Sequence, residues 1–473
     1  MNLNQLTIKE AQEGLKGKKF SSVELTKDCL ERIKKLNPIV NAFITITGKE
    51  ALESAKKADA LLASQGETLE ATPLLGIPTA FKDLFSTKNI KTTAGSKVLA
   101  DYIPPYDATV VTKLKNAGAV IIGKTNQDAW GHGSSGENSD FGPTKNPWNE
   151  NFVPGGSSSG SAAALASDMC LASTGTDTGG SIRLPASFCS IVGLKPTYGR
   201  VSRNGVIAMV SSLDSIGHFT KTVEDSAILL NITAGHDELD ATTPGVEAQD
   251  YTKSLNKSIK GLKIGVPKEY VEKGLNKSVR SCFEQALKVL EGLGAIIQQI
   301  SLPNTEYGIA TYYIIQPSEV SSNLARYDGI RYGSARQNFG DEAKRRTMLG
   351  TYTLSAGYYD AYYKKAMSVR TLIKRDFENA YKKIDAIIAP VSPTPPWKLG
   401  EKINDPLKMY LSDIFTVTAN LAGIPGLAIP AGFISGLPVG IQILGPQFSE
   451  HRLFQIGHQY EQATKWRKEK PKL

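Results

Sequence analysis

The hydrophobic and polar positions along the chain predict helices and strands in alternation. Near the N-terminus, Ser21 and Glu24 have the spacing of a capping box, and apolar residues at helical spacing follow until Asn37-Pro38, where we expect this helix to end. Later segments switch between helical periodicity and short apolar runs, with elements expected at residues 49–64, 74–81, 107–116, 119–122, 262–266, 279–290, 295–300 and 384–389. This alternation predicts an α/β fold with a mixed or largely parallel sheet.

A long uncharged stretch and an ordinary composition exclude several classes of protein. Residues 414–449 carry no charged side chain, but glycines and prolines interrupt them too often for a membrane helix, so we expect buried strands and turns. The N-terminus lacks an apolar signal core, so we expect a cytoplasmic protein without membrane association. With 41% hydrophobic and 21% charged residues among 473, the chain is neither disordered nor a small disulfide scaffold.

The net charge of +9 is spread along the chain, except for a basic C-terminal segment at residues 465–472. This segment leaves two interpretations open, an anionic partner or an ordinary solvated terminus. The four cysteines lack the spacing of metal ligands, so we expect no metal site in this chain.

Residues 118–125 match the phosphate-loop pattern G-x-x-x-x-G-K-[ST], but their context is wrong for nucleotide binding. A phosphate loop follows a strand and precedes a helix. Here a predicted helix precedes Gly118, and the four variable residues are themselves the expected apolar strand. We therefore predict a strand at this segment and reject ATP binding there.

Glycine, serine and threonine are densest between residues 131 and 205. A flexible linker would not contain the helix-forming run 162–166 or the buried-strand pattern 191–194, so we interpret this region as a folded site. Within it, Ser181 follows two glycines, whose accessible backbone amides suit the anionic intermediate of acyl transfer.

A nucleophilic serine needs a base, and the five histidines show no sequence relation to Ser181. Lys82 directly follows an apolar run, where α/β folds place site residues. A lysine is normally protonated at neutral pH, so a basic role requires burial or nearby positive charge. The residues alone leave Lys82 as either such a base or a surface lysine paired with Asp83.

Together these motifs resemble the amidase signature family, whose members carry a lysine after a strand, a serine in Gly-Gly-Ser-Ser and a second serine in Gly-[Ser/Thr]-Asp-x-Gly-Gly-Ser-Ile-Arg. The matching residues are Lys82, Ser157 and Ser181. The resemblance implies Ser181 as the nucleophile that forms an acyl-enzyme, Ser157 as a proton relay and Lys82 as the terminal base. It also implies that Asp177 and Arg183 hold the loop that carries Ser181 in place. An oxyanion hole is implied at the backbone amides of Thr178, Gly179, Gly180 and Ser181.

The resemblance further implies an α/β fold whose mixed central sheet is flanked by helices on both faces, in one large domain over residues 1–473. Within that domain we expect a helical region at 1–70, a catalytic core at 71–235, an α/β insertion with substrate-side helices at 236–400 and a C-terminal return to the core at 401–473.

Later segments are similar to one branch of this family, the glutaminase subunits of tRNA-dependent amidotransferases. The similar segments are residues 195–203, 321–329, 349–363 and 410–413. By that resemblance the substrate is glutamine, and its ammonia passes to a partner, the B subunit, which amidates Glu-tRNA(Gln) or Asp-tRNA(Asn). The complex also contains a C subunit, and the partner holds the charged tRNA, ATP and Mg²⁺, with no cofactor in this chain. Two other functions stay open: a standalone amidase for another small amide, and an inactive scaffold or RNA-binding subunit.

A free amino acid needs a cation for its carboxylate and an anion for its ammonium group. Arg346 and Asp413 resemble that pair, with Tyr312 or its neighbour assisting, and surface ion pairs are the alternative. Two departures from the family's pattern bear on the site. Ser159 replaces a glycine, which predicts a strained backbone. Residues 127–133 read Gln-Asp-Ala-Trp-Gly-His-Gly where Met-Asp-Glu-Phe commonly begins, which predicts a changed glutamine pocket.

Overall fold

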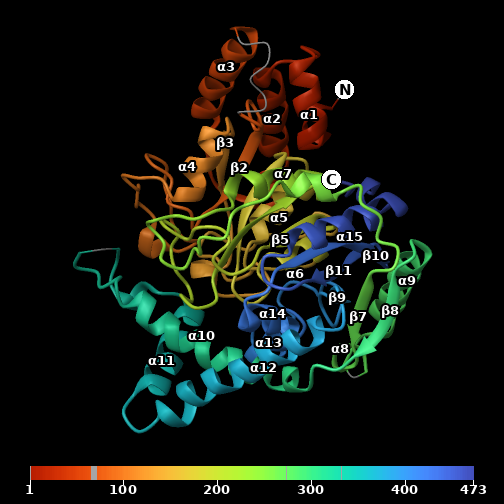
Figure 1. The fold of residues 1–473 in the computed structure, drawn as a ribbon. Helices are drawn as coiled ribbons and strands as arrows, with labels where there is room; N and C mark the ends of the chain where they lie inside the picture. The colour runs from red at the N-terminus through yellow and green to blue at the C-terminus, as the bar shows by residue number, and fades with distance from the viewer. Residues whose placement is uncertain (1, 65–71, 273, 332) are drawn as a thin grey trace.

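An 11-stranded sheet forms the centre of the molecule (Figure 1). The computed structural model describes residues 2–64, 72–272, 274–331 and 333–473. In sheet order the strands are β1 (Phe43–Ile46), β3 (Val120–Thr125), β2 (Pro78–Lys82), β4 (Ala172–Asp177), β6 (Ser215–Thr220), β5 (Val192–Lys195), β10 (Gly426–Ile434), β11 (Leu437–Leu444), β9 (Ala386–Pro390), β7 (Lys263–Pro267) and β8 (Ile296–Ile300). The sheet is mixed, because β2 is parallel to β3 and β4, and β7 is parallel to β8 and β9, whereas the other neighbours are antiparallel.

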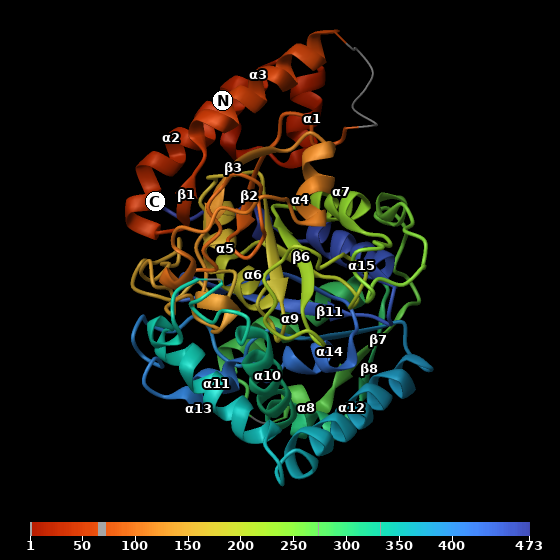
Figure 2. The same cartoon turned by 90° about the vertical axis from the view of Figure 1, so that its left-hand side faces the viewer.

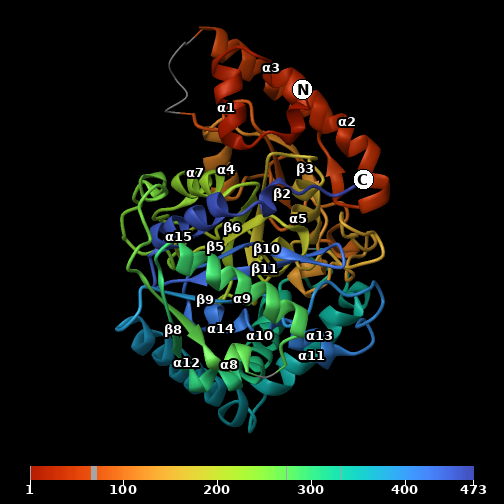
Figure 3. The same ribbon diagram turned by 90° about the vertical axis from the view of Figure 1, so that its right-hand side faces the viewer.

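Helices cover both faces of this sheet. On β10, a Cβ on Gly426 would point toward Arg183, whereas the next residue, Leu427, lies against Gly457. Since successive side chains of a strand point to opposite faces, the helices that carry Arg183 and Gly457 lie on opposite sides. Helix α5 packs with α6 on one side (Figure 2). On the other side, α7 and α9 pack with α15 (Figure 3). These helices are α5 (Ser159–Ala166), α6 (Arg183–Cys189), α7 (Val223–Thr233), α9 (Lys277–Gly292) and α15 (Glu450–Ala463). The predicted α/β fold with a mixed, helix-flanked sheet is confirmed.

Further helices extend the molecule beyond the sheet. Helices α1, α2 and α3 lie together at the end where β1 and β3 are found, and α10, α11 and α12 pack together at the opposite end (Figure 2). The remaining helices are α1 (Ile8–Lys16), α2 (Ser22–Val40), α3 (Gly48–Ser64), α4 (Thr109–Asn116), α8 (Lys268–Val271), α10 (Gly308–Leu324), α11 (Asp341–Leu354), α12 (Lys365–Tyr381), α13 (Pro406–Tyr410) and α14 (Val417–Ala422). The expected boundary between regions 1–70 and 71–235 falls at residues 65–71, outside the described residues.

The predicted elements are present with bounds that differ by a few residues from those expected, and α2 and β2 illustrate the differences. The capping box of α2 forms between Ser21 and Glu24, but the helix continues past Asn37-Pro38 and ends at Val40. Its last turn is closed by the N–H of Asn41, which adopts a left-handed conformation and donates to the Asn37 carbonyl at 2.8 Å. The apolar run predicted as a strand at 74–81 begins with a turn, and only residues 78–82 form β2.

The uncharged stretch at 414–449 is largely buried and forms α14 as well as the paired strands β10 and β11, so the predicted strands are confirmed and one helix was missed. In the basic C-terminal segment, Lys470 pairs with Asp168 at 2.8 Å. Among the described residues, the helices are too short or too polar to cross a membrane.

Candidate active site

Lys82 is the last residue of β2, and its side chain is buried against the Gly/Ser-rich region. The neighbouring parallel strands β3 and β4 end at the same edge of the sheet. Lys82 Nζ donates hydrogen bonds to Ser157 Oγ at 2.8 Å, to Ser158 Oγ at 2.9 Å and to Thr176 Oγ1 at 2.7 Å. The amine is therefore surrounded by hydroxyl groups.

Burial makes Lys82 easy to deprotonate. The side chain is fully buried, and burial lowers the pKa of Lys82 from 10.5 to about 7, although the charges of Asp128, Asp214 and Asp177 act in the opposite direction. A substantial fraction of this lysine is therefore neutral near pH 7, as a general base must be.

The alternative of Lys82 as a surface lysine paired with Asp83 is wrong. Asp83 is buried, and its Oδ1 lies 3.2 Å from Lys124 Nζ. Lys124 belongs to the phosphate-loop-like segment 118–125, whose variable residues lie in or next to β3. The predicted strand at that segment is confirmed, and its lysine forms a buried ion pair.

The two serines of the signature lie on adjacent loops. Ser157 follows a cis peptide bond with Gly156 and precedes α5, and Ser181 lies between β4 and α6. The N–H of Ser158 donates to the Ser181 carbonyl at 3.3 Å, which joins the loops. Among the described residues the Oγ atoms of Ser157 and Ser181 share no hydrogen bond, a contact that unliganded sites often complete only when substrate binds.

A buried ion pair holds the loop that carries Ser181. Asp177 Oδ1 lies 3.0 Å from Arg183 Nη2, and both side chains are fully buried. Asp177 also accepts hydrogen bonds from the backbone N–H groups of Gly180, Ile182 and Arg183. Burial acts to raise the pKa of Asp177, but the charge and hydrogen bonds of Arg183 lower it to about 2. The carboxylate is therefore ionised at neutral pH and ties the loop together.

The amides expected to form an oxyanion hole are not equivalent. The N–H of Gly180 already donates to Asp177 at 2.9 Å. Within the described part of the chain, the N–H groups of Thr178, Gly179 and Ser181 make no hydrogen bond. These three amides are therefore available to donate hydrogen bonds to a ligand, whereas the Gly180 amide holds the loop through Asp177.

The candidate substrate-binding residues Tyr312, Arg346 and Asp413 are all buried. Tyr313 links two of them, because its hydroxyl donates to Asp413 Oδ2 at 3.0 Å and its ring centre lies 5.9 Å from the Arg346 guanidinium. Arg346 pairs with Glu342, with 2.7 Å between Nε and Oε1. A solvated surface position for Arg346 is therefore wrong. Burial raises the pKa of Asp413 to about 7.

Residues 127–133, which depart from the family's pattern, and Ser134 just after them lie between Ser157 and Asp413. The N–H of Asp128 donates to the Ser157 carbonyl at 3.1 Å, and a Cβ on Gly131 would lie 3.7 Å from Ser157 Oγ. Ser134 Oγ donates to Asp413 Oδ2 at 2.8 Å. Burial raises the pKa of Asp128 to about 7. The sequence departure therefore lies between Asp413 and the group formed by Lys82 and its three hydroxyl partners.

The other departure, Ser159, does not strain the backbone, contrary to our expectation. It is the first residue of α5, its φ is outside the left-handed region, and its hydroxyl donates to Thr144 Oγ1 at 3.1 Å. Serine is well tolerated at the start of a helix, so this substitution changes a hydrogen bond and leaves the chain path intact.

Three residues in contact with the predicted set were missed from the sequence. Thr176 and Ser158 bind Lys82, and Glu342 pairs with Arg346. Adjacency to Ser157 was a usable signal for the serine, and helical spacing from the arginine was one for the glutamate. Tyr313, the neighbour of Tyr312 that the sequence left as an alternative, is the tyrosine that binds Asp413.

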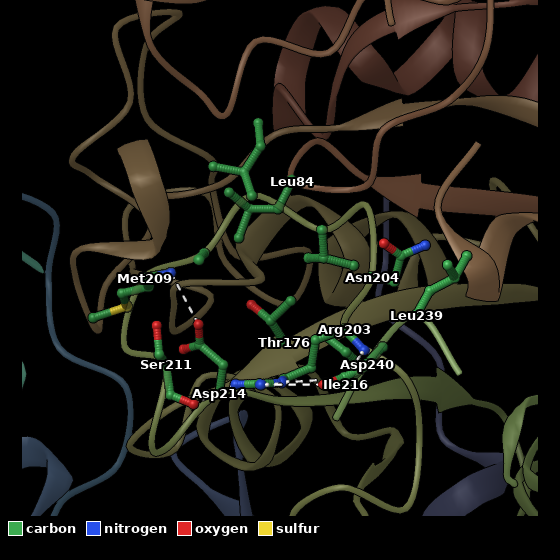
Figure 4. Close-up of a pocket in the computed structure, with 13 residues that line it drawn as sticks. Leu84, Thr176, Arg203, Asn204, Met209, Ser211, Asp214, Ile216, Leu239 and Asp240 are labelled. Atoms are coloured by element: carbon green, nitrogen blue, oxygen red, sulfur yellow. Dashed lines mark hydrogen bonds and ion pairs between the residues drawn. The ribbon is translucent and has the colours of Figure 1, made fainter. Parts of the chain in front are cut away.

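A cavity of about 160 Å³ is lined in part by Thr176 (Figure 4), whose hydroxyl binds Lys82. Thr176, Met209 and Asp214 line it, and Figure 4 marks the hydrogen bond from the Met209 N–H to Asp214 at 2.9 Å. Asp214 also accepts the hydroxyl of Thr178 at 2.7 Å, and burial raises the pKa of Asp214 to about 6. Because Thr176 binds Lys82 and Asp214 binds Thr178, the cavity adjoins both Lys82 and the loop that carries Ser181.

Comparisons with known proteins find similar proteins over the length of the chain. The family model described as Amidase matches residues 24–454. The glutamyl-tRNA(Gln) amidotransferase A subunit of Desulfatibacillum aliphaticivorans is 53% identical over 100% of both chains. The crystal structure of the same protein from Thermotoga maritima has a TM-score of 0.81 at 43% identity and covers 97% of this chain and 94% of its own. The peptide amidase of Stenotrophomonas maltophilia has a TM-score of 0.84 at 31% identity, over 97% and 96% of the two chains.

The family match spans most of the chain, and the relative from Desulfatibacillum aliphaticivorans is similar over the full length of both proteins. The chain belongs to the amidase family, in the group of glutamyl-tRNA(Gln) amidotransferase A subunits.

Proposed function

We propose that this chain is the glutaminase subunit of a tRNA-dependent amidotransferase and that it releases ammonia from glutamine through Lys82, Ser157 and Ser181. The observation that carries this proposal is the buried amine of Lys82, hydrogen bonded to Ser157 Oγ at 2.8 Å, with a pKa lowered to about 7. Full-length similarity to named A subunits supports glutamine as the substrate.

In the proposed reaction, Ser181 Oγ attacks the side-chain amide carbon of glutamine. Its proton passes to Ser157, and the Ser157 proton passes to neutral Lys82. The new C–O bond gives a tetrahedral oxyanion, which the free N–H groups of Thr178, Gly179 and Ser181 stabilise.

Collapse of the tetrahedral intermediate breaks the C–N bond. The proton held by Lys82 returns through Ser157 to the leaving nitrogen, so ammonia and a glutamyl ester of Ser181 are formed. Water then attacks the ester by the reverse proton path, which releases glutamate and restores the serine. Asp177 and Arg183 keep the loop in place and exchange no proton with the substrate.

We assign the amino-acid end of glutamine to the other side of the site. Arg346 carries the positive charge for the substrate carboxylate, and Asp413 carries the negative charge for its ammonium group. Tyr312 packs against Gly179, where a Cβ would lie 2.6 Å from its ring, so it closes the pocket beside the oxyanion amides.

The ammonia is proposed to serve a partner, the B subunit, in a complex that also contains a C subunit. The partner would hold ATP, Mg²⁺ and the charged tRNA, either Glu-tRNA(Gln) or Asp-tRNA(Asn), in the cytoplasm. A standalone amidase is the second candidate, because the peptide amidase of Stenotrophomonas maltophilia shares the fold at a TM-score of 0.84.

The test measures ammonia release from glutamine, asparagine and simple amides, by this chain alone and with the B and C subunits. Each sample is paired with its Ser181→Ala variant. We expect release from glutamine that rises with the partners and disappears in the variant. If the chain instead hydrolyses simple amides but not glutamine, at a rate that the partners do not change, it is a standalone amidase. If the Ser181→Ala complex retains full glutamine-driven amidation, the chain is a scaffold.

A further inference from the structure

His132 is a buried histidine whose ring makes no protein hydrogen bond. Its side chain is fully buried, and among the described residues neither Nδ1 nor Nε2 has a partner. Nearly all buried polar groups in folded proteins are paired, because an unpaired one loses its hydrogen bonds to water without replacement. Two unpaired nitrogens on one ring therefore indicate a place for a ligand group.

The position of His132 in the wall of the site indicates which ligand. The preceding residue, Gly131, lies against Ser157, and Ser134, two residues further on, binds Asp413. His132 therefore lies in the chain between the reactive hydroxyls and the charged end of the pocket.

Arg346 is the charged neighbour of this ring. Burial lowers the pKa of His132 well below its usual value, and the Arg346 charge lowers it further, so the imidazole is neutral and retains one N–H donor. Arg346 uses Nε for Glu342, and among the described residues its two terminal nitrogens make no hydrogen bond. Both side chains therefore have donors that no described residue uses, and the charge of Arg346 acts on the ring of His132.

We propose that His132 is a specificity-determining residue that donates a hydrogen bond to the substrate carboxylate beside Arg346. The inference rests on the proposed glutaminase function and names a contact within it. A carboxylate suits this place better than an ammonium group, because the neighbouring guanidinium repels a cation and attracts an anion. Neutral histidine adds a donor without adding a second positive charge.

The experiment compares two amides in the assembled complex with the B and C subunits. Glutamine carries the carboxylate, whereas 4-aminobutanamide has the same amide and amine without it. The variants are His132→Met, which fills similar space without a donor, and His132→Gln, which keeps an N–H donor. His458→Gln, on α15 across the sheet from α6, is the matched histidine control.

We expect His132→Met to raise the KM for glutamine about 10- to 100-fold with little change in kcat, the effect of losing one hydrogen bond to a charged group. The kcat/KM for 4-aminobutanamide stays at the wild-type value, and His132→Gln recovers part of the glutamine affinity. The control matches wild type for both amides.

Three results would overturn the inference. A KM for glutamine in His132→Met within about threefold of wild type would show that the donor is unused. Equal losses for both amides would show a structural role. If wild-type complex releases no ammonia from glutamine but hydrolyses simple amides, the glutaminase function fails and this inference fails with it, an outcome visible before any variant is made.

Discussion

The pH dependence of ammonia release is the most direct test of the role proposed for Lys82. The base must be neutral, and burial lowers the pKa of Lys82 to about 7, so activity should rise with pH and level off above that value. The shift from 10.5 corresponds to about 5 kcal/mol of preference for the neutral amine, at 1.36 kcal/mol per pKa unit. Asp128 and Asp214, which raise the pKa of Lys82, limit this shift.

The shift has a measurable size. At pH 7 about half of the lysine is neutral, compared with about 0.03% for a lysine of ordinary pKa. Between pH 6 and pH 8 the neutral fraction rises about tenfold and then levels off, whereas for an unshifted lysine it would rise about 100-fold and continue to rise.

The assay is kcat/KM for ammonia release from glutamine between pH 5.5 and 9 at constant ionic strength, because this ratio reports the pKa of the free enzyme. In the Lys82→Arg variant the guanidinium stays charged throughout this range, so we expect activity to fall at least about 100-fold at every pH. A flat profile in the wild type, or a rise that continues to pH 9, would refute the assignment of Lys82 as the base.

Three further predictions test the parts of the site separately. Gly179→Ala would place a Cβ 2.6 Å from the ring of Tyr312. We expect kcat to fall about 100-fold, the size of a lost oxyanion donor, with little change in melting temperature. An unchanged kcat would contradict the close packing of this loop. Arg183→Met leaves Asp177 as an unpaired buried carboxylate, so we expect the free energy of unfolding to fall by about 3–5 kcal/mol in urea titrations at pH 7, and a loss under about 1 kcal/mol would refute the ion pair as the support of the loop. Asp413→Asn removes the proposed anion for the substrate ammonium group, so we expect the KM for glutamine to rise about 10- to 100-fold, and an unchanged KM would remove Asp413 from the pocket.

The sequence alone was sufficient to locate the signature serines and the alternating elements, but not the state of the ionisable side chains. Ser157 and Ser181 lie in Gly/Ser-rich motifs that match the amidase signature pattern, and the alternation of helical and extended periods was sufficient to predict an α/β fold with a mixed or largely parallel sheet. Both signals are local, because they depend on residues a few positions apart. The helix α14 was missed inside the uncharged stretch, since a fully buried helix of six residues has no polar face to reveal its period.

Only the tertiary structure decided the chemistry of the ionisable groups. Lys82 could be either a surface lysine or a base, and the choice came from strands that bury its amine among hydroxyl groups from residues 157, 158 and 176. Arg346 was equally open until its burial beside Glu342 and Tyr313 was known. The physical reason is that a pKa or an ion pair depends on burial and on charges brought together from distant parts of the chain, and neither is encoded in the neighbouring residues.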